Sequence, residues 1–183
     1  MEPSSKPNTF CFADKGELKA AVVSYISTCS NNTNCLVGQN HGWPMNSWCV
    51  GNVTDMSELF KDMETFNEDI SGWDTSSVVS MENMFYNAIS FNGNLSSWNT
   101  SSVASMAMMF SGATSFNSDL SSWDISSVTS MNWMFEGATS FNGNISAWDT
   151  SSVTTINKTF AVIPKTTDAS TYGAFFVVVS CPS

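Results

Sequence analysis

An acidic column that recurs every 25 residues is the feature of this chain with the clearest capacity for chemistry. Asp74, Asp124 and Asp149 share the column with Asn99 and, at its first position, with Cys49. Carboxylates at a regular spacing can coordinate a cation, work as an acid and a base, or present a polar face to a partner. Which of these applies depends on the residues around the column.

The rest of the chain lacks the groups that would make these carboxylates catalytic. His41 is the only histidine and lies outside the repeats, so no Ser-His-Asp or Cys-His arrangement can be built on them. No C-x-x-C pair is present for zinc. Asp74, Asp124 and Asp149 share one row, whereas hydrolase or lyase chemistry needs carboxylates in different pKa environments. We predict that the protein is not an enzyme and holds neither a cofactor nor a metal.

Two further functions, calcium binding by the acidic column and ice binding by the threonine column, also fit poorly. Calcium takes six or more oxygen ligands, but a coil spacing of about 4.8 Å supplies one carboxylate per coil, and Asn99 interrupts the row. An ice-binding face needs a regular threonine array, but the threonine column is expected to point inward and is broken by Ile125. The simplest alternative to a binding role is that Asp and Ser complete the adjacent backbone turns.

The charge balance excludes several classes of partner. The chain has 6 Lys and Arg against 16 Asp and Glu, a net charge of −10, and no arginine. This balance repels nucleic acid and anionic membranes, and it lacks the bidentate fork that binds phosphate. No apolar run approaches the roughly 18 residues of a membrane-spanning helix. We expect no nucleic-acid binding and no membrane insertion.

Apolar residues share the 25-residue period of the acidic column. The columns are Val53, Val78, Val103, Val128 and Val153; Met56, Met81, Met106, Met131 and Ile156; Phe60, Phe85, Phe110, Phe135 and Phe160; Phe66, Phe91, Phe116 and Phe141; Ile70, Leu95, Leu120 and Ile145; and Trp48, Trp73, Trp98, Trp123 and Trp148. A fixed period of this length indicates one supersecondary unit per copy, stacked on its neighbours. We assign the apolar columns, tryptophans included, to the core.

The spacing within one unit predicts its local structure. Leu95-x-x-Trp98-x-Thr100-x-x-Val103 has the spacing of a leucine-rich repeat, with a β-branched residue suited to a short strand. Met-x-x-Met-Phe has the i, i+3, i+4 spacing of one helical turn. The predicted fold class is an α/β repeat solenoid, a right-handed leucine-rich-repeat-like coil with one short parallel strand and one helical turn per 25 residues. Trp and Thr point inward in that strand, so Asp74, Asn99, Asp124 and Asp149 form an outward stripe.

The segment before the repeats has the features of a capping helix. Asp14 and Glu17 fit an N-terminal capping box, and the apolar residues that follow lie on one helical face. We divide the chain into residues 1–11, a linker or disordered segment; 12–47, a helical cap with a cysteine cluster; 48–160, about five coils; and 161–183, an irregular C-terminal cap or a truncated end.

The cysteines favour an extracellular location, and the glycosylation sequons are compatible with it. Cys11, Cys29, Cys35 and Cys49 all fall near the cap, where three pairings are possible. Cys181 is expected to lie too far from them, so it is free, makes an intermolecular contact, or pairs with a part of a longer chain that is not included in this sequence. Paired cysteines indicate an oxidising compartment, although no signal peptide is visible and the chain is interpreted as part of a longer one. Six N-x-S/T sequons are compatible with secretion, and they begin at Asn31, Asn52, Asn94, Asn99, Asn144 and Asn157. The alternative is that most of them arise by chance, because the sequence is rich in Ser, Thr and Asn.

The repeat F-N-x-x-[IL]-S-x-W-[DN]-T-S-S-V-x-S-M-x-x-M-F-x-x-A resembles that of BspA-like leucine-rich-repeat surface proteins, and more closely their mycoplasma-lipoprotein-type branch, a repeat of unknown function. The resemblance covers about Phe12 to Phe160. It implies a secreted or surface recognition and adhesion module that binds an extracellular protein or glycan, and it carries over no catalytic motif. A structural spacer without a ligand is the alternative. Beside the acidic stripe, Met108 and Trp133 are predicted to form an exposed apolar pair for binding.

Overall fold

The computed structural model describes residues 10–29, 36–157 and 159. Almost all of the predicted segment 1–11 and all of the segment 161–183 lie outside the described residues, as do Cys35 and Cys181. Predictions made for those positions therefore stay predictions.

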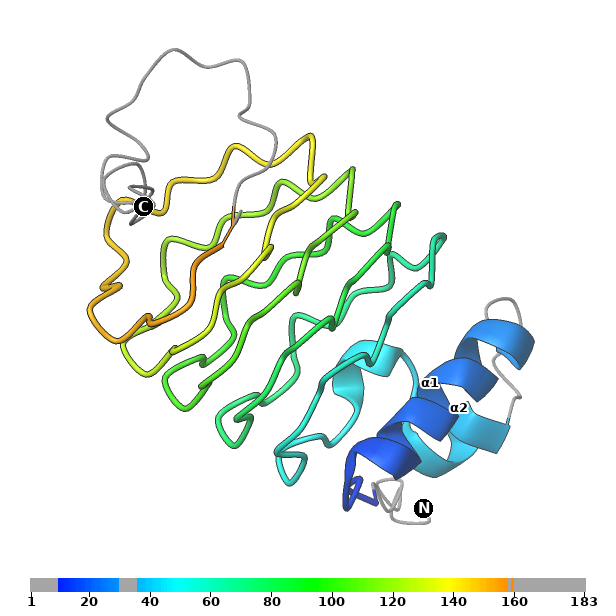
Figure 1. Ribbon diagram of the computed structural model, residues 1–183. Coiled ribbons are helices and arrows are strands. Elements are labelled where there is room, and N and C mark those ends of the chain that lie inside the picture. Colours follow the sequence, from blue (N-terminus) through cyan, green and yellow to red (C-terminus); the bar gives the residue numbers. More distant parts are fainter. Residues whose placement is uncertain (1–9, 30–35, 158, 160–183) are drawn as a thin grey trace.

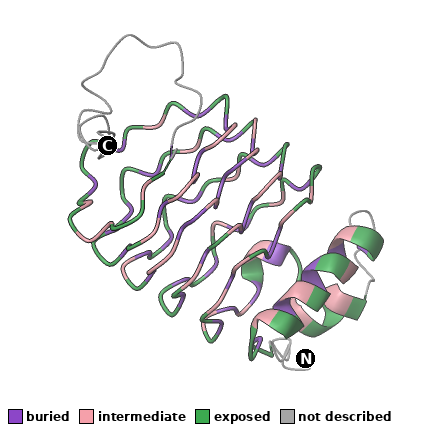
Figure 2. Ribbon diagram, viewed as in Figure 1, coloured by how far each residue is buried: buried purple, intermediate pink, exposed green. Residues whose placement is uncertain are grey.

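Three helical segments precede the repeats. They are α1 (Lys15–Thr28), α2 (Leu36–His41) and the 3-10 helix η1 (Met45–Ser47). From Trp48 onward the chain winds through successive coils that lie side by side, with the helices placed against the first coil (Figure 1). Buried and exposed residues alternate along each coil, so the apolar residues face a common interior (Figure 2).

The predicted α/β solenoid of leucine-rich-repeat type is wrong. In the described part of the chain the repeats contain no helix and no strand, and neighbouring coils pair only at isolated parallel bridges. These bridges join Asp55 to Ser80, Ser80 to Ser105, Ser105 to Ser130, and Ser130 to Thr155. A parallel sheet would need consecutive paired residues in each coil, and a single bridge per coil does not make one.

Turns occupy the place where the strand was expected. In the coil that begins at Trp73, the Trp73 N–H donates to Ile70 O and the Val78 N–H donates to Thr75 O. These two turns leave too few residues between them for a strand. Thr75 still points inward, as predicted, and its buried hydroxyl donates to Asn99 O of the next coil at 3.0 Å. The β-branched column therefore marks an inward-facing corner of the coil.

Overlapping turns likewise replace the predicted helical turn. The Met84 and Tyr86 N–H groups donate three residues back, to Met81 O and Asn83 O, whereas the Asn83 N–H donates to Ala107 O in the next coil. Asn83 has a φ of 54°, which lies outside the right-handed helical region. Local and coil-to-coil hydrogen bonds thus alternate along the segment, and a helix cannot form because every second N–H points to the neighbouring coil.

Stacked aromatic rings fill the interior as the columns predict. Phe110 lies 5.5 Å from the ring of Phe85 and 5.6 Å from that of Phe135, each nearly parallel, and 3.9 Å from Phe116 within its own coil. Each of these rings is at most 2% exposed. Burial of one large apolar side chain is worth roughly 1.5–3 kcal/mol, so these columns dominate the stability of the coils.

The tryptophan column is buried and hydrogen-bonded from coil to coil. The indole N–H of Trp98 donates to Ile70 O and that of Trp123 donates to Leu95 O, at 3.2 and 3.0 Å. Trp148 makes the same bond to Leu120 O. Each indole therefore satisfies its one donor inside the core, which confirms that these tryptophans are core residues.

Helix α1 forms as the capping pattern predicts. The Asp14 carboxylate accepts from the Glu17 N–H at 3.0 Å, and the Glu17 carboxylate accepts from the Ala13 N–H at 2.9 Å. The first bond satisfies a donor that the first helical turn leaves free, and the second holds the residue before the N-cap, where a capping box would bond the N-cap N–H itself. The helix buries Leu18, Ala21, Val22 and Tyr25, and the Tyr25 ring meets Trp48 of the first coil edge-on at 5.5 Å.

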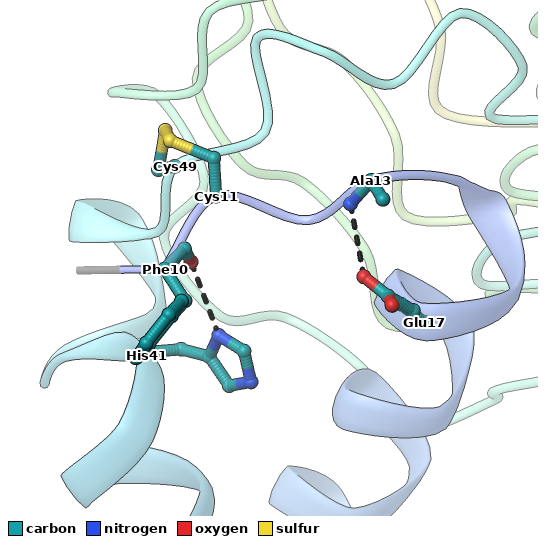
Figure 3. Close-up of a disulfide and its surroundings, with 6 residues drawn as sticks. All are labelled: Phe10, Cys11, Ala13, Glu17, His41 and Cys49. Atoms are coloured by element: carbon teal, nitrogen blue, oxygen red, sulfur yellow. Dashed lines mark hydrogen bonds between the residues drawn. A yellow bond between two sulfur atoms is a disulfide. The ribbon is translucent and has the colours of Figure 1, made fainter.

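A disulfide ties the start of the cap to the first coil. Cys11 and Cys49 are bonded, with their Cα atoms 4.5 Å apart (Figure 3). The Phe12 N–H donates to Cys49 O at 3.0 Å beside the bond. Cys29 is disulfide-bonded as well. The bond between Cys11 and Cys49 encloses α1, α2 and η1 in one loop of the chain.

Lysine side chains complete the contact between α1 and the first coil. The Lys19 ammonium donates to Glu58 O and Leu59 O at 2.7 and 2.6 Å. Met84 is the residue of the next coil that is equivalent to Leu59, and its carbonyl oxygen accepts a hydrogen bond from the Phe60 N–H of the first coil. Leu59 O has no preceding coil to supply such a donor, and Lys19 takes that role. Burial lowers the pKa of Lys19, since desolvation disfavours its charged form.

Candidate binding surface

The predicted acidic stripe lies on the surface, and each of its side chains completes a turn. Asp74, Asn99, Asp124 and Asp149 are all exposed. Each accepts a hydrogen bond from the N–H of the serine two residues later, at 3.1, 3.1, 3.0 and 3.0 Å. At the first three positions the serine hydroxyl donates to the same oxygen, at 2.6 to 2.7 Å. The interpretation that Asp and Ser complete the adjacent turn is therefore confirmed.

A second column with the same geometry occurs five residues earlier in each coil. Asp69, Asn94, Asp119 and Asn144 are exposed and accept from the serine two residues later at 2.9 to 3.0 Å. This column was not among the predicted binding residues, although the repeated pattern Asx-[Ile/Leu]-Ser marks it in the sequence. We call the two columns together the Asx ridge; its members are Asp69, Asp74, Asn94, Asn99, Asp119, Asp124, Asn144 and Asp149.

Hydrogen bonds within these turns stabilise the charged form of the ridge carboxylates. The Ser76 hydroxyl and N–H lower the pKa of Asp74 below its ordinary value, and Ser126 lowers that of Asp124 in the same way. For Asp149 the Ser151 N–H is the largest cause of the lowered pKa, and the charge of Asp124 opposes it. Carboxylates of adjacent coils therefore influence each other, and the stripe stays ionised at neutral pH.

Replacing Ser76 with alanine is expected to raise the pKa of Asp74 toward the ordinary carboxyl value of about 3.9. The pKa of Asp74 is lower in the folded chain than in the unfolded chain. The hydrogen bond from Ser76 therefore stabilises the fold at pH values above the unfolded pKa, and this stabilisation is lost as the pH falls through the folded pKa. Ser76→Ala should thus weaken the dependence of stability on acid pH. A carboxyl NMR titration of Asp74 tests this. Ser77→Ala is the matched control, and an unchanged Asp74 pKa in Ser76→Ala would contradict the assignment.

Comparison with known proteins identifies a family whose model matches most of the repeats. The family model described as "Mycoplasma protein of unknown function, DUF285" matches residues 27–128 and residues 54–171, and each match spans more than half of the chain. The chain belongs to the DUF285 family. This confirms the resemblance to a mycoplasma-type repeat of unknown function, whereas the BspA-like leucine-rich-repeat assignment is not part of the match. No curated protein and no solved structure matches this DUF285 chain significantly.

The second predicted patch of the DUF285 chain is less exposed than expected. Met108 and Trp133 are both half-buried, and both have a φ of 54°. Their N–H groups donate to Asn132 O and Asn157 O of the following coils. The same left-handed backbone occurs at Glu58 and Asn83 of the preceding coils. The side chains of Met108 and Trp133 lie partly against the coils instead of projecting fully from them. Large side chains are uncommon in this conformation.

No further chemistry gathers in the described part of the DUF285 chain. It contains no group of three or more His, Cys, Asp or Glu that could hold a metal, and none of its helices is long and apolar enough to cross a membrane. A shallow depression between α1 and the first coil is lined by Lys15, Lys19 and Lys61. Lys15 and Lys61 pair with Asp55 and Glu58, at 2.6 and 3.3 Å, so these ammonium groups are already occupied.

Proposed function

We propose that this DUF285 chain is a non-enzymatic recognition module at the cell surface or outside the cell. It binds an extracellular protein or glycan through the stripe formed by Asp74, Asn99, Asp124 and Asp149. One observation carries the proposal: the four side chains are exposed and held in the same Asx turn in successive coils. Such pre-organised oxygens lose little conformational freedom when a ligand binds.

The charge of the stripe suggests the chemistry of the partner. Asp74, Asp124 and Asp149 are ionised at neutral pH, as ordinary aspartates are, and their turn hydrogen bonds lower the pKa of each further. A row of negative charge attracts a complementary positive surface and speeds encounter with it. A protein with a basic patch, or a glycan that carries amines, meets this requirement. The exposed apolar surface of Met108 and Trp133 is small, so we assign them at most a secondary role.

The resemblance to BspA-like surface proteins and the disulfide support the location. Cys11 and Cys49 are bonded, and disulfides persist mainly in secreted and surface proteins. Membership of this family is compatible with a surface protein that contacts other molecules. Adhesion is the form of recognition that this resemblance favours.

A spacer without a ligand is the second candidate, and a specific observation favours it. Many polar groups on the outer faces bond to the preceding coil. The Thr129 hydroxyl donates to Ala104 O, the Thr154 hydroxyl donates to Thr129 O, and the Ser122 hydroxyl donates to Ser96 O. Surfaces whose hydrogen bonds are satisfied internally offer less to a partner.

A binding array of extracellular proteins and glycans distinguishes the two functions. The probe is the purified chain, made in a host without N-glycosylation, against the triple variant Asp74→Asn/Asp124→Asn/Asp149→Asn. Asparagine keeps the turn acceptor and removes only the charge. We expect a partner of the unaltered chain to bind the variant about tenfold more weakly, since exposed pairs contribute up to about 1 kcal/mol each.

Asp69→Asn/Asp119→Asn is the matched control, because it neutralises carboxylates of the same turn type outside the stripe. Equal losses in both variants would indicate general charge attraction, not a site at the stripe. Binding retained in the triple variant would move the site to Met108 and Trp133. No binding by the folded chain would favour the spacer.

A further inference from the structure

The Asx ridge has the sequence pattern of N-linked glycosylation. All eight ridge positions read Asx-x-Ser with no proline between, because the turn needs a side-chain acceptor followed two residues later by a serine N–H and hydroxyl. Wherever the acceptor is asparagine, this turn is also the sequon for an N-linked glycan. Asn94, Asn99 and Asn144 meet the condition.

The geometry of these three asparagines leaves the reactive nitrogen accessible. Each side chain is exposed, and its Oδ1 atom accepts from the serine N–H at 3.0 to 3.1 Å. In Asn99 and Asn144 the serine hydroxyl also donates to Oδ1, at 2.7 and 2.8 Å. The Nδ2 atoms donate no hydrogen bond to any described residue. The turn thus holds the amide by its oxygen and directs its nitrogen to solvent.

The sequon at Asn157 shows the opposite arrangement. Its hydroxyl residue, Thr159, is only 4% exposed. The Thr159 hydroxyl donates to Met131 O at 2.8 Å and to Ile156 O at 3.1 Å. An enzyme that must engage this hydroxyl would have to pull it from the coil. The folded structure therefore separates sequons on the ridge from one that is built into the interior.

We propose that Asn94, Asn99 and Asn144 are attachment sites for N-linked glycans. In the transfer, the Nδ2 atom forms a bond to the anomeric carbon of a lipid-pyrophosphate-linked oligosaccharide. The bond from that carbon to the pyrophosphate oxygen breaks, the lipid pyrophosphate leaves, and an oligosaccharyltransferase base takes one Nδ2 proton. The inference rests on the proposed extracellular location but not on the proposed binding activity.

Attachment at Asn99 would change the stripe. Asn99 stands between Asp74 and Asp124 in successive coils, whose stacked phenylalanine rings lie 5.5 and 5.6 Å apart. A glycan is much wider than this spacing, so it covers the neighbouring carboxylates. The glycosylated chain therefore cannot present the central stripe to a protein partner, whereas Asp149 and the unmodified form remain available. A ridge position that carries Asn instead of Asp therefore presents a glycan instead of a negative charge, while the turn stays the same.

The test directs the full chain into the secretory pathway of a eukaryotic cell, which supplies the location. Peptide mapping by mass spectrometry, before and after an amidase that removes N-glycans, reports each site. We expect glycans at Asn94, Asn99 and Asn144. The variant Asn94→Asp/Asn99→Asp/Asn144→Asp should lose all three and fold unchanged, because Asp69, Asp74 and Asp119 already support the same turn.

A gain-of-site variant completes the experiment. Asp124→Asn creates the sequon Asn-Ile-Ser in the same turn and should acquire a glycan, detected as one added mass of the same size. Exposed Asn52, which lies off the ridge, reports whether the chain reached the enzyme. A folded, secreted chain with a glycan at Asn52 and none on the ridge would overturn the proposal. We also expect less glycan at Asn157 than at the ridge sites, and equal occupancy would overturn the part of the proposal that assigns site selection to the folded geometry.

Discussion

Replacing Phe110 with alanine is expected to lower the free energy of unfolding by about 3–5 kcal/mol. Phe110 is fully buried and stacks on Phe85 and Phe135 of the two neighbouring coils, at 5.5 and 5.6 Å. It also lies 3.9 Å from Phe116 and 6.2 Å from Trp123. The cavity would therefore open toward three coils, whose stacked backbones are tied by hydrogen bonds and cannot collapse into it.

Chemical denaturation monitored by tryptophan fluorescence and far-UV circular dichroism measures this loss. Phe10→Ala is the control, because Phe10 is 65% exposed and its removal should change stability by no more than about 0.5 kcal/mol. A loss below about 1 kcal/mol for Phe110→Ala would mean that the aromatic columns do not form a shared core. It would also mean that coils contribute independently, contrary to the nearest-neighbour coupling of repeat proteins.

The inward-facing residues could be predicted from the period alone. A residue type that recurs every 25 positions must meet its own copies when coils stack, whatever the local backbone does. This is why the Phe, Met and Trp residues of these columns that the structure describes were correctly assigned to the core, and why Thr75 was correctly placed inside; Phe160 lies outside the described residues. The capping helix was predictable for a different reason, because Asp14 and Glu17 act within one helical turn and need no tertiary contact.

The local backbone of the coil could not be predicted in the same way. Apolar residues at i, i+3 and i+4 face one side in a helical turn, and they also face one side in two overlapping turns. Gly112 and Gly137, with φ values of 73° and 71°, are the residues that would have favoured turns. Met108 and Trp133 adopt φ 54° without any such preference. The N–H groups at these two positions bond to the next coil, and a contact between coils is invisible within one repeat.

On the surface, too, the period predicts which hydrogen bonds repeat from coil to coil, but it does not predict how far each residue is buried. A polar residue that recurs beside a buried phenylalanine, here the asparagines at 67, 92, 117 and 142, predicts an internal ladder that satisfies backbone groups. The ladder exists: the Asn92 N–H donates to Asn67 Oδ1 at 2.9 Å and the Asn117 N–H to Asn92 Oδ1 at 2.8 Å. Its members are exposed, however. A recurring polar residue identifies a repeated bond, but its burial depends on where the coil turns outward.

Removing the disulfide between Cys11 and Cys49 is expected to destabilise the cap by about 4 kcal/mol and to leave the coils nearly unchanged. The bond spans 38 residues, and this loop contains α1, α2 and η1. Closing a loop of that length removes much of the conformational entropy of the unfolded cap. The remaining contacts with the first coil include the pair of Lys15 with Asp55, which is partly exposed and therefore weak.

Hydrogen exchange of the Cys11→Ser/Cys49→Ser variant measures this effect by segment. Amides of α1 should exchange several hundredfold faster, the rate change that corresponds to about 4 kcal/mol, while amides around Phe110 keep their protection. Cys11→Ser alone is a poorer test, because it leaves a free thiol at Cys49. Equal acceleration in α1 and in the central coils would contradict the prediction. It would show that the cap and the coils unfold as one unit, and that Lys19 and Tyr25 transmit the loss from α1 into the stack.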